Sequence, residues 1–273
     1  MSSSGFDAIP QRDLGAILNA AFEIYGANAS KLFVIVAVVV VPLSLISHLL
    51  TGVVFAARKT TIVGLNGTST VHVTHGAGFL IATALVTALI TIITYAILQA
   101  ALIRGAAQAT VGDAVDVETS YKWGLRKFGT VLLVSFLTGI LVVIGLILLI
   151  VPGVILLTRF TVAIPALVIE DHKGTEPMNR SWNLTRGHFW HVLGTIFVAG
   201  LIGAVVSGII SALGAIAGTS WFTEWVFGSI GEIVVAPFSA LVSIILYLDL
   251  RARTEGLTAI ALRTVLEEAP PSS

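Results

Sequence analysis

The sequence predicts an all-α fold: a polytopic membrane helix bundle of about six transmembrane helices, with amphipathic interfacial helices on the cytoplasmic side. Composition is the first reason, because 56% of the 273 residues are hydrophobic and only 11% are charged, whereas about a quarter are charged in a soluble domain. The second is a mean hydropathy of +0.99. The third is a series of long apolar stretches separated by charged segments.

Six stretches meet or approach the length of a membrane span, which is about 20 apolar residues. They are 32–55, 78–103, 129–151, 154–169, 189–216 and 225–248. Only Pro152-Gly153 separates the third from the fourth. One helix over both would be roughly 60 Å long, while the hydrocarbon core is about 30 Å thick. We therefore expect the chain to turn at Pro152-Gly153.

The charged segments predict the orientation and the organisation of the chain. Of 15 Lys and Arg residues, only Arg58 and Lys59 fall in a predicted outer loop and Arg159 in a span. Because basic loops stay inside, both termini are expected in the cytoplasm and the protein in a bacterial inner membrane. The expected parts are a cytoplasmic amphipathic segment (1–31), the six-helix membrane domain (32–250) and a cytoplasmic tail (251–273).

The first apolar run and the outer loop that follows it carry further local signals. The first apolar run is longer than the roughly 7–15 residues of a signal-peptide core, so we expect a first span and no cleaved leader. In the outer loop, Asn66-Gly67 lies between β-branched residues and predicts a β-hairpin. The triplet Asn66-Gly67-Thr68 also fits a glycosylation sequon, but a turn is the preferred interpretation.

Each odd-numbered span follows an amphipathic segment in which an aromatic residue precedes a Phe by seven or eight positions. The pairs are Tyr25 and Phe33, Tyr121 and Phe128, and Trp182 and Phe189. One hypothesis is three repeated units, each an interfacial helix followed by two spans. The alternative is that any linker at a membrane surface becomes amphipathic and carries aromatic residues there.

The third of these segments predicts a helix that lies flat on the inner leaflet. Thr175 can cap it, Pro177 fits its first turn, and Gly187 can end it. Residues expected to contact lipid headgroups at this surface are Arg180, Arg186, Trp182 and Trp190.

The fifth span has small residues at every fourth position, which lets helix backbones approach closely. One row includes Gly203 and Ser207, and the other includes Gly200 and Gly208. These four residues are the predicted helix-packing positions. They place the fifth span at the centre of the bundle or at a dimer contact.

Three ionisable residues inside the spans form a candidate intramembrane polar cluster: Arg159, Glu232 and His48. Counting residues from the span ends puts them at similar depths in the outer half of the bundle. They predict an ion, proton or anionic headgroup site. The alternatives are a structural Arg159–Glu232 pair and an Arg159 side chain that extends outward to the headgroups.

Metal sites and catalytic motifs find weaker support in the sequence than the intramembrane polar cluster. His188 and His191 lie on one helix face near Glu170, Asp171 and His172, but interfacial histidines are the preferred interpretation over a metal site. The sequence shows no phosphate-binding glycine loop, nucleophile elbow or HExxH motif, and it contains no cysteine. We expect no metal, no cofactor and no catalytic residue. A net charge of zero also argues against a nucleic-acid partner.

Several segments resemble the membrane domain of glycerophosphoryl diester phosphodiesterases. They are GAIL with AAFEIY near the start, IVPGVILLTRFTVAIPALVIE, RSWNLTRGHFW and LYLDLRARTEGL. The resemblance implies a stand-alone six-helix membrane module. It does not imply phosphodiesterase activity, since that belongs to a separate α/β barrel for which this chain leaves no sequence.

The expected function is therefore that of a non-catalytic integral membrane protein, a scaffold or accessory factor in lipid or cell-envelope processes. One alternative is a small transporter or channel subunit that uses the intramembrane polar cluster. Another is a membrane enzyme acting on lipid headgroups. The expected partners are membrane lipids, a second copy of the chain or another membrane protein.

Overall fold

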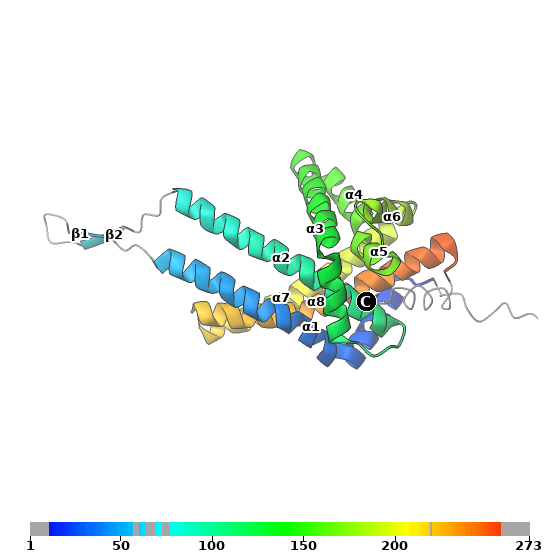
Figure 1. Cartoon of the computed structure of the whole chain (residues 1–273), viewed down its shortest axis with the longest axis horizontal. Helices are drawn as coiled ribbons and strands as arrows, with labels where there is room; N and C mark the ends of the chain where they lie inside the picture. Colours follow the sequence, from blue (N-terminus) through cyan, green and yellow to red (C-terminus); the bar gives the residue numbers. More distant parts are fainter. Residues whose placement is uncertain (1–10, 57–59, 64–68, 73–76, 219, 258–273) are drawn as a thin grey trace, which may run out of the picture.

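The computed structural model describes residues 11–56, 60–63, 69–72, 77–218 and 220–257. These residues form eight helices and one β-hairpin, and six helical segments are long and apolar enough to cross a membrane. The predicted helical membrane fold is confirmed (Figure 1). In order, the elements are α1 (Leu14–Ala56), β1 (Thr60–Val63), β2 (Ser69–His72), α2 (Ala77–Thr110), α3 (Val117–Leu148), α4 (Ile150–Phe160), α5 (Ala163–Glu170), α6 (Glu176–Thr185), α7 (Phe189–Ala217) and α8 (Trp221–Glu255).

The amphipathic segments differ in how they join their spans. In α1 and α3 the amphipathic part continues into the span as one helix. Only α6 is a separate helix, because Gly187 adopts φ +88°, which interrupts the helical path before α7. Thr175 precedes α6 without a side-chain capping hydrogen bond, while Pro177 lies in its first turn as expected.

The turn between the third and fourth spans lies earlier than the sequence predicts. Leu149, with φ −161° and ψ 145°, separates α3 from α4, and Pro152 lies inside the first turn of α4. A proline is tolerated there because that turn has no intrahelical partner for its N–H. Glycines let the two helices meet, since a Cβ on Gly145 would lie 2.9 Å from the Gly153 Cα.

The fourth span is not one helix but two. It breaks at Thr161 and Val162, between α4 and α5, and α5 is almost completely buried. The helix α5 ends at Asp171, which takes the left-handed conformation with φ 53°. This break turns the end of the span towards the charged end of the molecule.

The outer loop contains the predicted β-hairpin. Strands β1 and β2 pair antiparallel, with Thr60 opposite His72 and Val63 opposite Ser69. The expected Asn66-Gly67 turn falls within residues 64–68, which lie outside the described residues.

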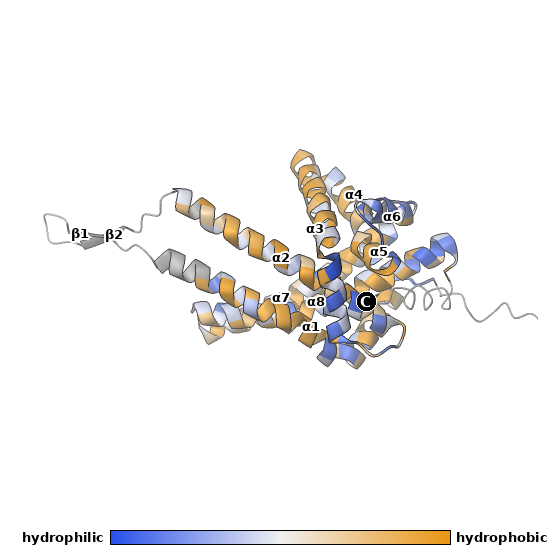
Figure 2. Ribbon diagram, in the orientation of Figure 1, coloured by the Kyte–Doolittle hydropathy of each residue, from blue (hydrophilic) through white to orange (hydrophobic). Residues whose placement is uncertain are grey.

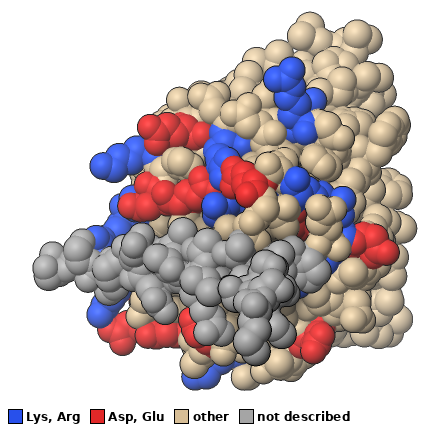
Figure 3. Space-filling view, turned by 90° about the vertical axis from the view of Figure 1, so that its right-hand side faces the viewer, with Lys and Arg blue, Asp and Glu red and all other residues tan. Residues whose placement is uncertain are grey.

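The most buried of the six spans is α8, not α7. Within the most apolar part of each span, 67% of residues are buried in α8 and 11% in α7. The small residues of α7 therefore do not place it at the centre. Figure 2 shows apolar residues along all the spans and polar ones gathered at one end. Figure 3 looks onto that end, where acidic and basic side chains lie side by side.

Candidate functional site

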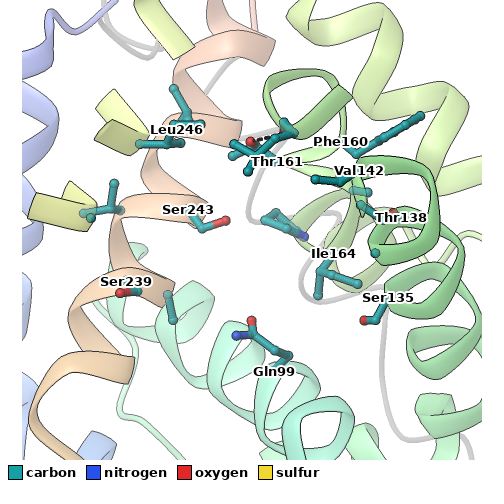
Figure 4. Close-up of a pocket in the computed structure, with 18 of the residues that line it drawn as sticks. Gln99, Ser135, Thr138, Val142, Phe160, Thr161, Ile164, Ser239, Ser243 and Leu246 are labelled. Carbon is teal, nitrogen blue, oxygen red and sulfur yellow. Dashed lines mark hydrogen bonds between the residues drawn. The ribbon is translucent and has the colours of Figure 1, made fainter. Parts of the chain in front are cut away.

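A cavity of about 560 Å³ lies between α2, α3, the α4–α5 segment, α7 and α8. Its wall carries hydroxyl and amide groups from several helices (Figure 4). None of the described residues lining it is Lys, Arg, Asp, Glu or His. The polar lining residues are Tyr95, Gln99, Ser135, Thr138, Thr161, Ser239 and Ser243.

The cavity exists because α2 and α3 approach closely near the charged end and diverge beyond it (Figure 1). At the close approach, a Cβ on Gly124 would lie 3.2 Å from the backbone nitrogen of Ala101. On the opposite wall the side chains are small, among them Ala199, Gly200 and Ala240. Diverging helices on one side and small residues on the other leave the space unfilled.

A second hollow, of about 520 Å³, runs between α2 and α3 and is almost entirely apolar. It shares Tyr95, Ser135, Gly139 and Val143 with the cavity, so the two adjoin. Its outer wall lies on the surface that a membrane would cover, where the exposed side chains include Ile92, Phe136, Ile140 and Ile144. We call this hollow the α2–α3 groove.

Two hydroxyls on the cavity wall have no hydrogen-bond partner in the described part of the chain. They are Ser135 Oγ and Thr138 Oγ1, both buried on α3 and three residues apart. By contrast, Thr161 donates to the Leu157 carbonyl of its own helix at 2.7 Å. A buried hydroxyl without a partner is costly. These two groups are therefore available to a molecule that enters the cavity.

A network of ion pairs ties α5, α6 and α8 together at the charged end. Glu170 receives two hydrogen bonds of 2.8 Å from Arg180, one from Nε and one from Nη2. Arg180 also pairs with Glu255, which lies 3.0 Å from Arg251 Nε. The hydroxyl of Tyr247 donates to the same Glu170 carboxylate. We call this set the Glu170 network.

The Glu170 network overturns one prediction. Arg180 does not face lipid headgroups but turns inward, and only 23% of its side chain is exposed. Burial disfavours the charged guanidinium, yet hydrogen bonds to Glu255 and Glu170 outweigh that effect and raise its pKa. From the sequence, Arg180 is expected at the lipid headgroups because it lies in an amphipathic segment. No sequence pattern indicates that it pairs with Glu255.

A second charged group links the start of the described chain to the last helix. The fully buried Asp249 accepts a hydrogen bond of 2.6 Å from the Arg12 backbone N–H and one of 2.7 Å from Arg253 Nε. His191 Nε2 lies 2.9 Å from the same carboxylate. His191 thus bonds to Asp249 rather than joining His188. The described residues contain no group of three or more side chains suited to a metal.

Comparison with known proteins was made against families, curated proteins and solved structures. Residues 131–250 match the family described as the membrane domain of glycerophosphoryl diester phosphodiesterase. Over these residues the chain is similar to that family. The predicted resemblance is confirmed. No curated protein and no solved structure matches the chain.

The segment that matches this family, residues 131–250, supplies most of the cavity. It contains Ser135, Thr138, Thr161 and both α8 serines of the wall, while α2 contributes its residues from outside the matched segment. The same segment contains Glu170 of the charged network. The cavity is thus bounded by the matched segment on most sides and closed by α2.

The structure does not bring the predicted intramembrane polar cluster together. Arg159 lies over the ring of Trp182, 5.1 Å from its centroid. It forms no ion pair with Glu232, which is exposed, and His48 Nδ1 lies 2.9 Å from the carbonyl oxygen of Ser44 in its own helix. The depths expected for Arg159 and Glu232 are wrong because the fourth span is not one straight helix. Helix α4 is short, and α6 packs against α4.

The other predicted positions divide between the surface and the interior. Arg186, Trp182 and Trp190 are exposed at the charged end, as headgroup contacts require. In α7, Gly203 is buried against Val235. The remaining predicted packing positions are half-buried or exposed; these are Gly200, Ser207 and Gly208.

Proposed function

We propose that this chain is a non-catalytic integral membrane protein that binds a membrane lipid and serves lipid or cell-envelope processes as an accessory factor or scaffold. One observation carries the proposal: the apolar α2–α3 groove leads from the membrane-facing surface to a cavity lined by neutral polar groups. A membrane lipid likewise has an apolar acyl chain that leads to a polar headgroup. The cavity volume also falls within the usual range for small-molecule sites.

The groove suits an acyl chain. Its exposed wall is formed by branched and aromatic side chains, including Ile92, Phe136 and Ile140. Lipid chains meet this surface in any bilayer, so entry needs no passage through water. The hydroxyls of Ser135 and Thr138 lie where the groove and the cavity adjoin, and they offer hydrogen bonds to the polar end of the lipid.

The proposed absence of catalysis follows from the chemistry of the lining. General acid–base catalysis needs a titratable group within hydrogen-bond reach of the reacting atoms. The described lining residues offer hydroxyls and an amide. Nearby carboxylates and guanidinium groups of the Glu170 network are engaged with one another. Transport at Arg159 and Glu232 finds no support, because these residues form no ion pair and face different surroundings.

We place the protein in a bacterial inner membrane with both termini in the cytoplasm. The asymmetry of basic residues supports this orientation. The contact of Arg12 with Asp249, beside Arg253, supports it further, since both ends of the described chain lie at the charged end. The exposed small residues of α7 offer a surface for a second copy or another membrane protein.

Lipid binding can be tested with a phospholipid that carries a photoreactive group on its acyl chain. The purified chain in bilayer discs should be labelled more strongly in the α2–α3 groove than on the equally lipid-exposed face of α7 at Leu201 and Val205. Gly139→Trp, at the junction of groove and cavity, should reduce that labelling. Gly208→Trp, where an added side chain meets nothing within 4 Å, is the matched control. Equal labelling of both surfaces would exclude the proposal.

A further inference from the structure

We propose that the cavity selects a lipid whose headgroup is uncharged and bears a hydroxyl, with diacylglycerol as the ligand, over phospholipids. This inference rests on the proposed lipid binding and adds the chemical class of the lipid. It starts from the lining, in which the described residues provide seven hydroxyl or amide side chains and no ionisable acid or base other than the phenol of Tyr95.

A phosphate group would enter this cavity at a high cost. An ion that leaves water for a poorly polarisable interior needs a partner of opposite charge and several hydrogen bonds. The basic groups nearest in the fold do not line the cavity. Arg180 and Arg251 pair with Glu170 and Glu255, and Arg159 lies over Trp182.

Arg104, on the same helix as Gln99, is buried but is not among the lining residues. Its electrostatic partner is Asp171, at the charged end. A phosphate in the cavity would thus find no cation on its wall.

The hydroxyls that the cavity presents match a glycerol unit esterified with two acyl chains. Ser135 and Thr138 come from α3, and Ser239 and Ser243 come from α8 on the facing wall (Figure 4). A hydroxyl both donates and accepts a hydrogen bond. Diacylglycerol presents one hydroxyl, which can do both, and ester carbonyls, which accept. The two α3 hydroxyls lack any other partner in the described part of the chain.

The position of the groove agrees with this orientation. It adjoins the cavity on the side of Ser135 and Gly139 and extends along α2 and α3 past Ile92, Ile140 and Ile144. A lipid with its glycerol at Ser135 would therefore lay one acyl chain in the groove. Its second chain would remain in the surrounding bilayer. The protein would not need to break any described ion pair to admit the lipid.

The test compares three lipids with identical photoreactive acyl chains: diacylglycerol, phosphatidylglycerol and phosphatidylethanolamine. Each is added to the full chain in bilayer discs, and labelled peptides of α2 and α3 are measured by mass spectrometry. We expect diacylglycerol to label the groove about tenfold more than either phospholipid. A tenfold ratio corresponds to about 1.4 kcal/mol, which is less than the cost of burying an unpaired phosphate charge and is therefore the minimum that the proposal requires.

The variant Ser135→Ala/Thr138→Val should lower diacylglycerol labelling by about fivefold, as expected for the loss of hydrogen bonds to the ligand. Its thermal stability should not fall, because neither hydroxyl has a partner to lose. Thr83→Val/Ser211→Ala removes two hydroxyls away from the cavity and should leave labelling unchanged.

Each other outcome is decisive. Equal labelling by all three lipids, or preference for a phospholipid, would overturn the selectivity and leave lipid binding standing. Full labelling of the Ser135→Ala/Thr138→Val variant would also overturn it. No groove labelling by any of the three lipids would overturn both the selectivity and the proposed function.

Discussion

Arg180 and Glu170 form a two-point ion pair that joins α6 to the end of α5, with both hydrogen bonds at 2.8 Å. A planar guanidinium that meets a carboxylate in this way fixes both distance and orientation. Because Glu255 of α8 shares the same guanidinium, one side chain holds three helices. The separate helix α6 is thus anchored to the bundle rather than merely resting on the membrane surface.

Arg180→Leu should therefore destabilise the protein. It would leave Glu170 and Glu255 partly buried with one fewer cation. Removing one member of a fully buried pair costs about 3–5 kcal/mol, and the partial exposure of Arg180 and Glu255 lowers that cost. We expect a fall of several degrees in the thermal midpoint in detergent. Arg186→Leu, on the exposed end of the same helix, is the control and should change little. Equal midpoints for the two variants would show that the network contributes no stability.

Gly203→Leu should weaken the packing of α7 on α8. A Cβ at Gly203 would lie 3.0 Å from Val235 Cγ1, so a larger side chain must separate the helices. Overpacking of this kind costs about 1–3 kcal/mol. Gly208→Leu adds the same side chain to the same helix where nothing lies within 4 Å. Thermal unfolding in detergent should distinguish the two; a Gly203→Leu protein as stable as Gly208→Leu would contradict the packing described.

The start of α3 should loosen in acid. Asp116 caps this helix and accepts hydrogen bonds from the Thr119 side chain and backbone, which lower its pKa below the ordinary value of 3.8. The folded state favours the carboxylate, so its stabilising effect is complete above 3.8 and is lost as the pH falls through the lowered pKa. Amide exchange at Glu118 and Thr119 should show less protection in Asp116→Ala at neutral pH. Unchanged protection in that variant would show that the cap is dispensable.

Arg159 and Glu232 should behave as independent residues. They form no ion pair, and Arg159 stacks on Trp182 instead. The change in unfolding free energy of Arg159→Leu/Glu232→Leu should therefore equal the sum for the single variants within about 0.5 kcal/mol. A double variant clearly more stable than that sum would restore the pair that sequence reasoning predicted.

The orientation can be read from cysteine labelling, since the natural sequence has no cysteine. Asn66→Cys, in the predicted outer loop, and Ser272→Cys, in the tail, should react with a membrane-impermeant maleimide from opposite sides. The reason is the odd number of spans expected between them. Labelling of both from one side of intact cells or inverted vesicles would exclude the proposed topology.

The sequence predicted the elements of the fold more accurately than their arrangement. Apolar length and charge spacing are local properties, so six spans, a hairpin and the helix end at Gly187 could be anticipated. Which helix lies at the centre could not, because an apolar side chain has the same pattern whether it faces lipid or protein. The most apolar parts of α8 and α7 have similar mean hydropathies, 2.2 and 2.4, although the first is mostly buried and the second mostly exposed.

The candidate site was missed for a related reason. Ser135 and Thr138 look like ordinary hydroxyl residues of a transmembrane helix, and only their lack of partners singles them out. Conversely, Arg159, Glu232 and Arg180 drew attention through their charge. Whether a charge is paired depends on contacts such as Arg180–Glu255, which join residues 75 positions apart.

The ion pairs of the Glu170 network, of Asp249 and of Lys122 and Lys127 lie at the charged end, among residues 118–127, 170–191 and 249–255. Beyond the close approach at Gly124, the surfaces that α2 and α3 present to the groove are almost entirely apolar. The charged end therefore fixes α2 and α3 relative to each other more tightly than the groove does. We therefore expect the width of the α2–α3 groove to respond to the lateral pressure of the surrounding bilayer, and thus to acyl-chain length and membrane curvature.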